Sequence, residues 1–76
     1  MNWQERITIN PAVLVGKPVI KGTRLAVEFI VDLFAQGLTE TEILDNYPGI
    51  SHEDLLACWQ YASQVLKSER VFPIPA

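Results

Sequence analysis

Two short breaks divide residues 26–67 into three segments with helical periodicity. Gly37 forms the first break, and glycine suits the left-handed position that commonly follows the last turn of a helix. Pro48 and Gly49 form the second break, because neither residue continues a helix readily. Three helices joined by such short connections predict a mainly α fold, a three-helix bundle whose last two helices make a helix–turn–helix unit.

A capping residue follows each break. Thr39 and Glu42 have the spacing of a capping box, which predicts that a second, short helix begins there. Ser51 is a preferred cap for a third helix, and Asp54 in its first turn interacts favourably with the positive end of that helix. We therefore expect a longer, amphipathic third helix that extends to residue 67.

The first helix, over residues 26–36, is apolar around most of its circumference. Its polar residues Glu28, Asp32 and Gln36 are four apart and form a single stripe. Two short helices cannot surround the remaining surface, which favours burial in a homodimer. The residues expected at this dimer interface are Phe29, Ile30, Leu33 and Phe34. The alternative is that the N-terminal segment covers the spare face.

Residues 1–25 predict an extended arm or a small β hairpin. Residues 6–10 are alternating and β-branched, and Pro11 ends that strand. Residues 13–15 and 18–20 are two more short pieces expected to be extended, with turns at the neighbouring glycines. Because a hairpin of this size is only marginally stable alone, we expect it to dock on the helices.

Charge is divided between this arm and the helical body. Residues 8–27 contain no acid and carry only Lys17, Lys21 and Arg24, whereas residues 28–54 contain no Lys or Arg. Glycines beside these cations allow the backbone to approach phosphate groups closely. The residues predicted to contact DNA are Lys17, Lys21, Thr23 and Arg24 of the arm, with Gln60 of the third helix as a reader of adenine.

The sequence of the third helix supports DNA binding less than that of the arm does. The positions expected to face outward early in this helix are His52, Glu53, Leu56, Ala57 and Gln60. Glu53 and Asp54 would face phosphates, where a recognition helix normally supplies cations. The buried face is expected to comprise Leu55, Cys58, Trp59, Ala62, Val65 and Leu66, with Tyr61 at its rim. For the third helix, the alternative is that it serves only as part of a structural three-helix bundle. For the arm, the alternative is that Arg24 pairs with Glu28 and that the lysines are solvated in turns without binding DNA.

Composition limits the class of protein. The 76 residues make one domain, residues 1–76, with net charge −3 and a sequence pI near 4.9, which argues against nonspecific nucleic-acid binding by the whole molecule. A hydrophobic content of 49% is high for so small a body and favours an interface. No leader-like segment opens the chain and no apolar run could cross a membrane, so we expect a cytoplasmic protein.

The sequence contains few residues in an arrangement typical of a catalytic site. His52 and Cys58 are the sole histidine and cysteine, and at six positions apart they point to different faces of a helix. A zinc site needs more ligands of this kind, and the carboxylates lie at helix starts, where capping explains them. Gly22-Thr23 lacks the lysine of a phosphate-binding P-loop. We therefore expect no enzyme activity, no metal and no cofactor.

The C-terminal residues 68–76 form an apolar tail punctuated by prolines, which predicts an extended segment. Its residues Val71, Phe72 and Ile74 are candidates for binding a partner protein by adding a strand or filling a groove. The alternative is that the tail folds back over the first and third helices.

Residues 16–24, which read GKPVIKGTR, resemble a motif of a family of small bacterial and archaeal proteins, the domain of unknown function 433. Three short motifs further along the chain also match the family in sequence and spacing. They are Gly37-Leu38-Thr39, Tyr47-Pro48 and Asp54-Leu55. The resemblance covers residues 7–72 and implies a homeodomain-like helix–turn–helix fold. It also implies an antitoxin-like role, as a partner of a PIN-like ribonuclease toxin or as a DNA-binding autoregulator.

These observations lead to one principal hypothesis. The protein is expected to be a noncatalytic, homodimeric antitoxin that holds a PIN-like ribonuclease toxin through its tail and acidic surface and binds its own operator DNA through the arm. The rival hypothesis is a stand-alone homodimeric helix–turn–helix regulator of transcription. A purely structural dimer is a third possibility.

Overall fold

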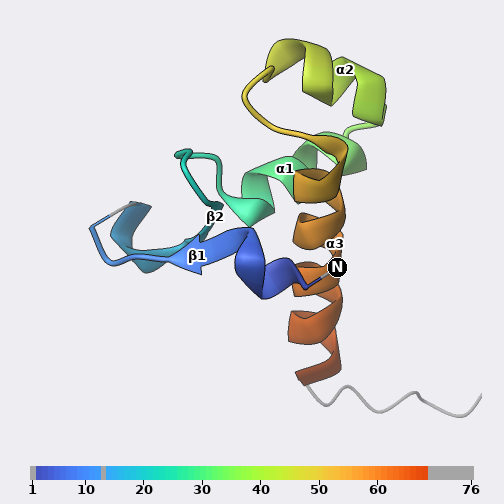
Figure 1. Ribbon diagram of the computed structural model, residues 1–76. Helices are drawn as coiled ribbons and strands as arrows, with labels where there is room; N and C mark the ends of the chain where they lie inside the picture. Colours follow the sequence, from blue (N-terminus) through green and yellow to red (C-terminus); the bar gives the residue numbers. More distant parts are fainter. Residues whose placement is uncertain (1, 13, 69–76) are drawn as a thin grey trace, which may run out of the picture.

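The computed structural model describes residues 2–12 and 14–68 and consists of a two-stranded hairpin beside three α-helices (Figure 1). In chain order the main elements are β1 (Ile7–Ile9), β2 (Pro18–Ile20), α1 (Val27–Ala35), α2 (Glu40–Asn46) and α3 (His52–Ser68). The hairpin projects to one side of the helices, and α2 lies beyond the N-terminal end of α3. This arrangement confirms the predicted mainly α fold with a short N-terminal hairpin.

The hairpin docks on the helices through one of its faces. β1 and β2 are antiparallel, with Ile7 opposite Ile20 and Ile9 opposite Pro18. Because alternate residues of a strand share a face, these four side chains lie on the same side of the hairpin. Ile7 and Ile20 are buried in the core, whereas Ile9 is exposed. The inner end of the hairpin therefore closes the core, and its outer end extends away from the helices.

The loop between the strands differs from the prediction. Leu14–Gly16 is a 3₁₀ turn and not an extended piece, while Val13 lies outside the described residues. Leu14 and Val15 have φ angles of 49° and 55°, in the left-handed region that favours glycine. Val15 is 95% exposed, so burial of its side chain does not offset this strain.

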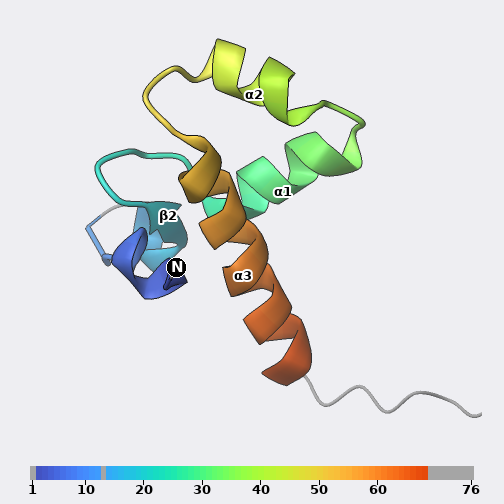
Figure 2. The same ribbon diagram turned by 45° about the vertical axis from the view of Figure 1, so that its right-hand side comes forward.

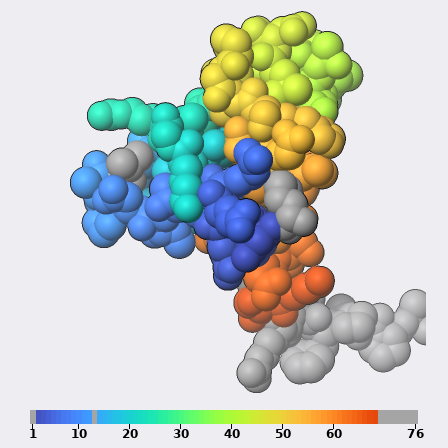
Figure 3. Space-filling model, viewed as in Figure 1, coloured from blue at the N-terminus to red at the C-terminus, as the bar shows by residue number. Residues whose placement is uncertain are grey.

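A second 3₁₀ turn, Trp3–Glu5, was not predicted from the sequence. The Trp3 ring packs edge-to-face on Tyr61 of α3, with 5.1 Å between the ring centroids. Figure 3 shows this N-terminal segment lying over α3. The contact places Tyr61, which is partly buried, against the edge of the core, as predicted for a residue at the rim.

The core collects apolar side chains from the hairpin and from all three helices. Ile20, Ile30, Ile43 and Leu55 are its largest fully buried members. Ile30 is 0% exposed and faces the interior of the monomer. The prediction that Ile30 contributes to a dimer interface is therefore wrong, because a fully buried side chain has no surface left to offer a second copy.

Along α3 the predicted buried face is correct only in the N-terminal half. Leu55 is 1% exposed as expected, and Ala57, which was expected to face outward, is fully buried. Trp59 was expected in the core but is 44% exposed, and Val65 and Leu66 are exposed too. In Figure 2 the C-terminal part of α3 extends past α1 and the hairpin, which explains the difference.

Candidate functional site

The cations of the arm do not all remain available to a ligand. The Lys17 ammonium forms an ion pair with the Glu28 carboxylate in the first turn of α1. The alternative in which Arg24 takes Glu28 as its partner is wrong, since Lys17 occupies that position. Lys21 and Arg24 are exposed on the loop that joins β2 to α1. The structure thus separates one structural lysine from two cations that project toward solvent.

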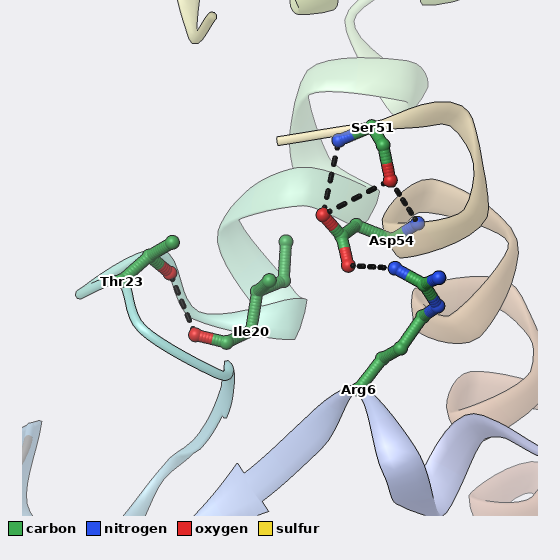
Figure 4. A network of polar contacts seen from close by, with 5 residues as sticks. All are labelled: Arg6, Ile20, Thr23, Ser51 and Asp54. Carbon is green, nitrogen blue, oxygen red and sulfur yellow. Dashed lines mark hydrogen bonds and ion pairs between the residues drawn. The ribbon is translucent and has the colours of Figure 1, made fainter. Parts of the chain in front are cut away.

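Thr23, another predicted DNA contact, has its hydroxyl engaged in the turn. The hydroxyl donates a hydrogen bond to the Ile20 carbonyl at 2.8 Å, which Figure 4 shows, and accepts one from the Leu25 backbone N–H at 3.0 Å. Gly22, with a φ of 78°, provides the left-handed position beside it. The characteristic Lys-Gly-Thr-Arg run therefore builds the loop that carries the exposed Lys21 and Arg24.

An ion pair joins the arm to the start of α3, and the sequence did not reveal it (Figure 4). Asp54 accepts hydrogen bonds through one carboxylate oxygen from the backbone N–H and hydroxyl of Ser51, at 3.0 and 3.2 Å. Its other oxygen accepts from Arg6 at 3.1 Å. Asp54 thus points inward, contrary to the expectation that it would face phosphates. Capping spacing identified Ser51 and Asp54, but nothing local indicates Arg6, which is 48 positions away.

The outward surface of the helix–turn–helix unit is acidic. Glu42 accepts from the backbone N–H of Thr39 at 3.0 Å and from its hydroxyl, which lowers the pKa of the Glu42 carboxyl. The pKa of Glu53 is also lowered, chiefly by its own backbone N–H. Both carboxylates are therefore ionised at neutral pH, and they present negative charge at the starts of α2 and α3.

Three more residues complete this surface. His52 Nδ1 lies 2.7 Å from a carboxylate oxygen of Glu40 and so connects the first turns of α2 and α3. Leu56 and Gln60 are exposed and share the stripe of α3 that begins at Glu53. Gln60 lines a shallow hollow with residues from the N-terminal turn, and the arm cations do not contribute to that hollow. The structure therefore does not bring Gln60 and the arm cations together into one site.

An apolar groove lies where α1 meets the C-terminal half of α3. We call it the α1–α3 groove and define it by Pro18, Val27, Val31, Ala62, Val65 and Leu66. One of its two apolar hollows measures about 390 Å³ and has Glu28 at one edge. Lys67 borders the adjoining hollow, which shares Val31 and Leu66. The groove was not predicted from the sequence, because helical periodicity places Val65 and Leu66 in the core.

The other predicted dimer residues of α1 lie elsewhere. Phe29 is partly exposed and packs edge-to-face on Tyr47, with 5.8 Å between the ring centroids. Phe34 packs on Trp59 at 5.1 Å, and Leu33 is partly buried against the core. These side chains have partners within the monomer, so they are less available to a second copy than the α1–α3 groove.

The residues with nucleophilic or metal-binding chemistry are dispersed. Burial raises the pKa of the Cys58 thiol to about 12, so this residue is a protonated core side chain at neutral pH. Across residues 2–12 and 14–68, no group of three or more His, Cys, Asp or Glu side chains could hold a metal ion. Over the same ranges, no helix has the length and apolar character needed to cross a membrane. The tail residues Val71, Phe72 and Ile74 lie outside the described part of the chain.

Comparison with known proteins places the chain in a family. The model of the family described as "Protein of unknown function (DUF433)" matches residues 7–62. A crystal structure of a DUF433 member from Anabaena variabilis ATCC 29413 has a TM-score of 0.79 and 40% sequence identity, and the match covers 86% of this chain. The chain spans 64% of that protein's length. No curated protein matches it. By the family model and the shared fold, the chain belongs to the DUF433 family.

Proposed function

We propose that this protein is a noncatalytic antitoxin-like protein that binds and neutralises a PIN-like ribonuclease toxin. The observation that carries the proposal is the outward face of α3 in the helix–turn–helix unit, where Glu53, Leu56 and Gln60 form one exposed stripe. A helix that reads DNA normally offers cations and amides to the phosphates and bases. This stripe offers a carboxylate, an apolar side chain and a single amide, which suits a protein partner better.

Charge supports a basic partner. No Lys or Arg occurs between Arg24 and Lys67, and the exposed carboxylates of Glu42 and Glu53 add negative charge at the starts of α2 and α3. A ribonuclease needs cations on the surface that holds its RNA substrate. Complementary charge would speed the encounter and orient the two proteins, while Leu56 at the centre would supply apolar contact. Covering that basic surface would block the substrate, so no catalytic residue is required of the antitoxin.

The test is purification of the tagged protein from its native host at near-native levels, with identification of any protein recovered in stoichiometric amount. We expect a ribonuclease encoded beside it, whose RNA cleavage is inhibited by the purified chain. Asp45 is an exposed carboxylate of α2, and Glu53 is one of α3. Asp45→Asn with Glu53→Gln should weaken that complex, and the affinity should fall as salt rises.

A matched control separates local from overall charge. Gln4→Lys with Ala12→Lys raises the net charge by the same amount at exposed positions outside α2 and α3, and it should leave the complex nearly unchanged. Equal weakening by both pairs, or full inhibition by the Asp45 and Glu53 variant, would place the contact elsewhere. Removal of residues 71–76 then tests whether Val71, Phe72 and Ile74 take part.

A second candidate function is operator DNA binding by a homodimer, either as autoregulation or as the whole role. The exposed Lys21 and Arg24 on the loop before α1 favour it. Replacing Lys21 and Arg24 with Ala should flatten the salt dependence of operator binding, by about one unit of slope for each phosphate that the protein no longer neutralises. Lys17→Ala should change the slope less, because Lys17 is paired with Glu28. Recovery of this chain alone from the native host, together with such a change in slope, would favour the stand-alone regulator.

A further inference from the structure

The α1–α3 groove is an apolar surface that the described residues leave uncovered. Leu66 is 66% exposed at its centre, and Val65 and Trp59 are exposed beside it. The groove floor is apolar as well, since Val27 and Ala62 line it. A contiguous apolar surface of this kind on so small a domain marks a site of protein association.

We propose that this groove is the interface between two copies of the chain, with the C-terminal halves of their α3 helices packed antiparallel. The proposal concerns a different surface from the acidic face of α2 and α3, so it stands whether or not a ribonuclease is the partner. It also differs from the interface expected from the sequence, which relied on Ile30 and on aromatic residues of α1 that pack within the monomer.

The spacing along α3 suits packing against an identical helix. Trp59, Ala62 and Leu66 are three and four positions apart, so they form a narrow apolar stripe of the kind that joins paired helices. Ala62 is small and leaves a depression between its larger neighbours. In an antiparallel pair centred between these positions, Leu66 of each copy fills the depression at Ala62 of the other. The surface is thus complementary to itself, as a two-fold interface requires.

Charge at the two ends of the groove selects the antiparallel orientation. Glu28 lies at the edge formed by α1, and Lys67 lies near the end of α3. An antiparallel arrangement carries Lys67 of the second copy toward the level of α1, where the exposed Glu28 carboxylate, whose Oε1 pairs with Lys17, offers its second oxygen. A parallel arrangement would place the two Lys67 ammonium groups beside each other. The complementary ends therefore indicate a second copy as the occupant.

Light scattering and sedimentation equilibrium of the full chain test the interface. We expect the wild type to have the mass of a dimer and Leu66→Arg to have that of a monomer with unchanged helical circular dichroism. Leu66→Gln, a milder change, should raise the dimer dissociation constant if the arginine variant does not fold. Leu56→Arg is the matched control, because Leu56 is an exposed leucine on the same helix outside the groove, and it should remain dimeric. A wild type that is monomeric up to millimolar concentration, or a Leu66→Arg dimer, would overturn the proposal.

A charge exchange tests the orientation. Lys67→Glu should weaken the dimer by about tenfold at low salt, because two-fold symmetry repeats the exposed ion pair on both sides of the interface. Glu28→Lys combined with it should restore the affinity. The single Glu28→Lys variant is the control, because it measures the effect on the dimer of breaking the Lys17–Glu28 ion pair within each monomer. An unchanged dimer in Lys67→Glu, or no restoration in the double variant, would contradict the antiparallel arrangement. The Leu56→Arg and Leu66→Arg variants also distinguish the two proposals, because toxin binding should depend on Leu56 and self-association on Leu66.

Discussion

The two halves of α3 have the same apolar spacing but different surroundings. In the N-terminal half, Leu55, Ala57 and Cys58 are buried beneath the hairpin, α1 and the loop after α2. In the C-terminal half, Val65 and Leu66 repeat the apolar spacing but lie on the surface. Hydrophobic periodicity therefore identifies a stripe that needs a partner, and it does not tell whether the partner is in the same chain.

The difference follows from where the other elements end. The Arg6–Asp54 ion pair and the Trp3–Tyr61 contact hold the N-terminal segment against the first three turns of α3. Beyond that level α1 and the hairpin border the helix only at the α1–α3 groove, and its last turns extend past both (Figure 2). The packed half thus belongs to the core of the monomer, and the exposed half is the part of the helix free to meet another protein.

The largest expected effect separates the two halves by stability. Leu55→Ala removes a side chain that is 1% exposed and should lower the free energy of unfolding by about 3 kcal/mol, because apolar burial is reduced and a cavity forms. Leu66→Ala is the matched control and should cost less than about 1 kcal/mol at low protein concentration, where self-association does not contribute. Urea unfolding followed by circular dichroism measures both. Similar losses for the two leucines would remove the distinction between the halves.

Local signals in the sequence predicted the packed half better than the exposed one. Capping spacing located the starts of α2 and α3, because Thr39–Glu42 and Ser51–Asp54 make their contacts within one helical turn. The Arg6 partner of Asp54 could not be predicted, because the two residues are 48 positions apart and no local spacing pattern connects them. Trp59 was misplaced because a large aromatic on an apolar stripe fits a core and an exposed groove equally well.

The same limit applies to the candidate site. The arm cations were found from charge segregation, and Lys21 and Arg24 are indeed exposed. The pairing of Lys17 with Glu28 and the use of the Thr23 hydroxyl in the turn depend on the hairpin's position against α1, which no local pattern encodes. The α1–α3 groove depends on the relative lengths of α1 and α3, so it became visible only in three dimensions.

The second prediction concerns what holds the packed half in place. Asp54→Ala removes the cap at the start of α3 and the ion pair with Arg6, and it should destabilise the protein by about 2 kcal/mol. Arg6→Ala removes only the ion pair, which is partly exposed, and should cost about 1 kcal/mol or less. A double-mutant cycle on unfolding free energies separates the two contributions. If Arg6→Ala costs as much as Asp54→Ala, the arm and not the cap dominates the stability of this half.

The third prediction extends the comparison to the tip of the hairpin, where the exposed Val15 has a left-handed backbone conformation. Val15→Gly should stabilise the protein by about 0.5 kcal/mol, because the relief of a left-handed β-branched residue exceeds the added entropy of the unfolded chain. Val15→Ala keeps a Cβ and should give a smaller gain, if any. Thermal unfolding of the two variants provides the measurement. Destabilisation by glycine would indicate that the Val15 side chain makes a stabilising contact in spite of its exposure.

The smallest expected effect is on pH dependence, and it again distinguishes the halves of α3. The pKa of Glu53 in the folded state lies below the ordinary 4.5, so the unfolded chain binds this proton more readily. Glu53 therefore contributes stability above pH 4.5, and that contribution is lost as the pH falls through the folded pKa. Glu53→Gln should make the acid-side loss of stability shallower in urea unfolding measured over a pH series. Residues 55–68 contain no carboxylate, so this sensitivity resides in the packed half alone. Parallel pH profiles for wild type and variant would show that the hydrogen bonds to Glu53 do not stabilise the start of the helix.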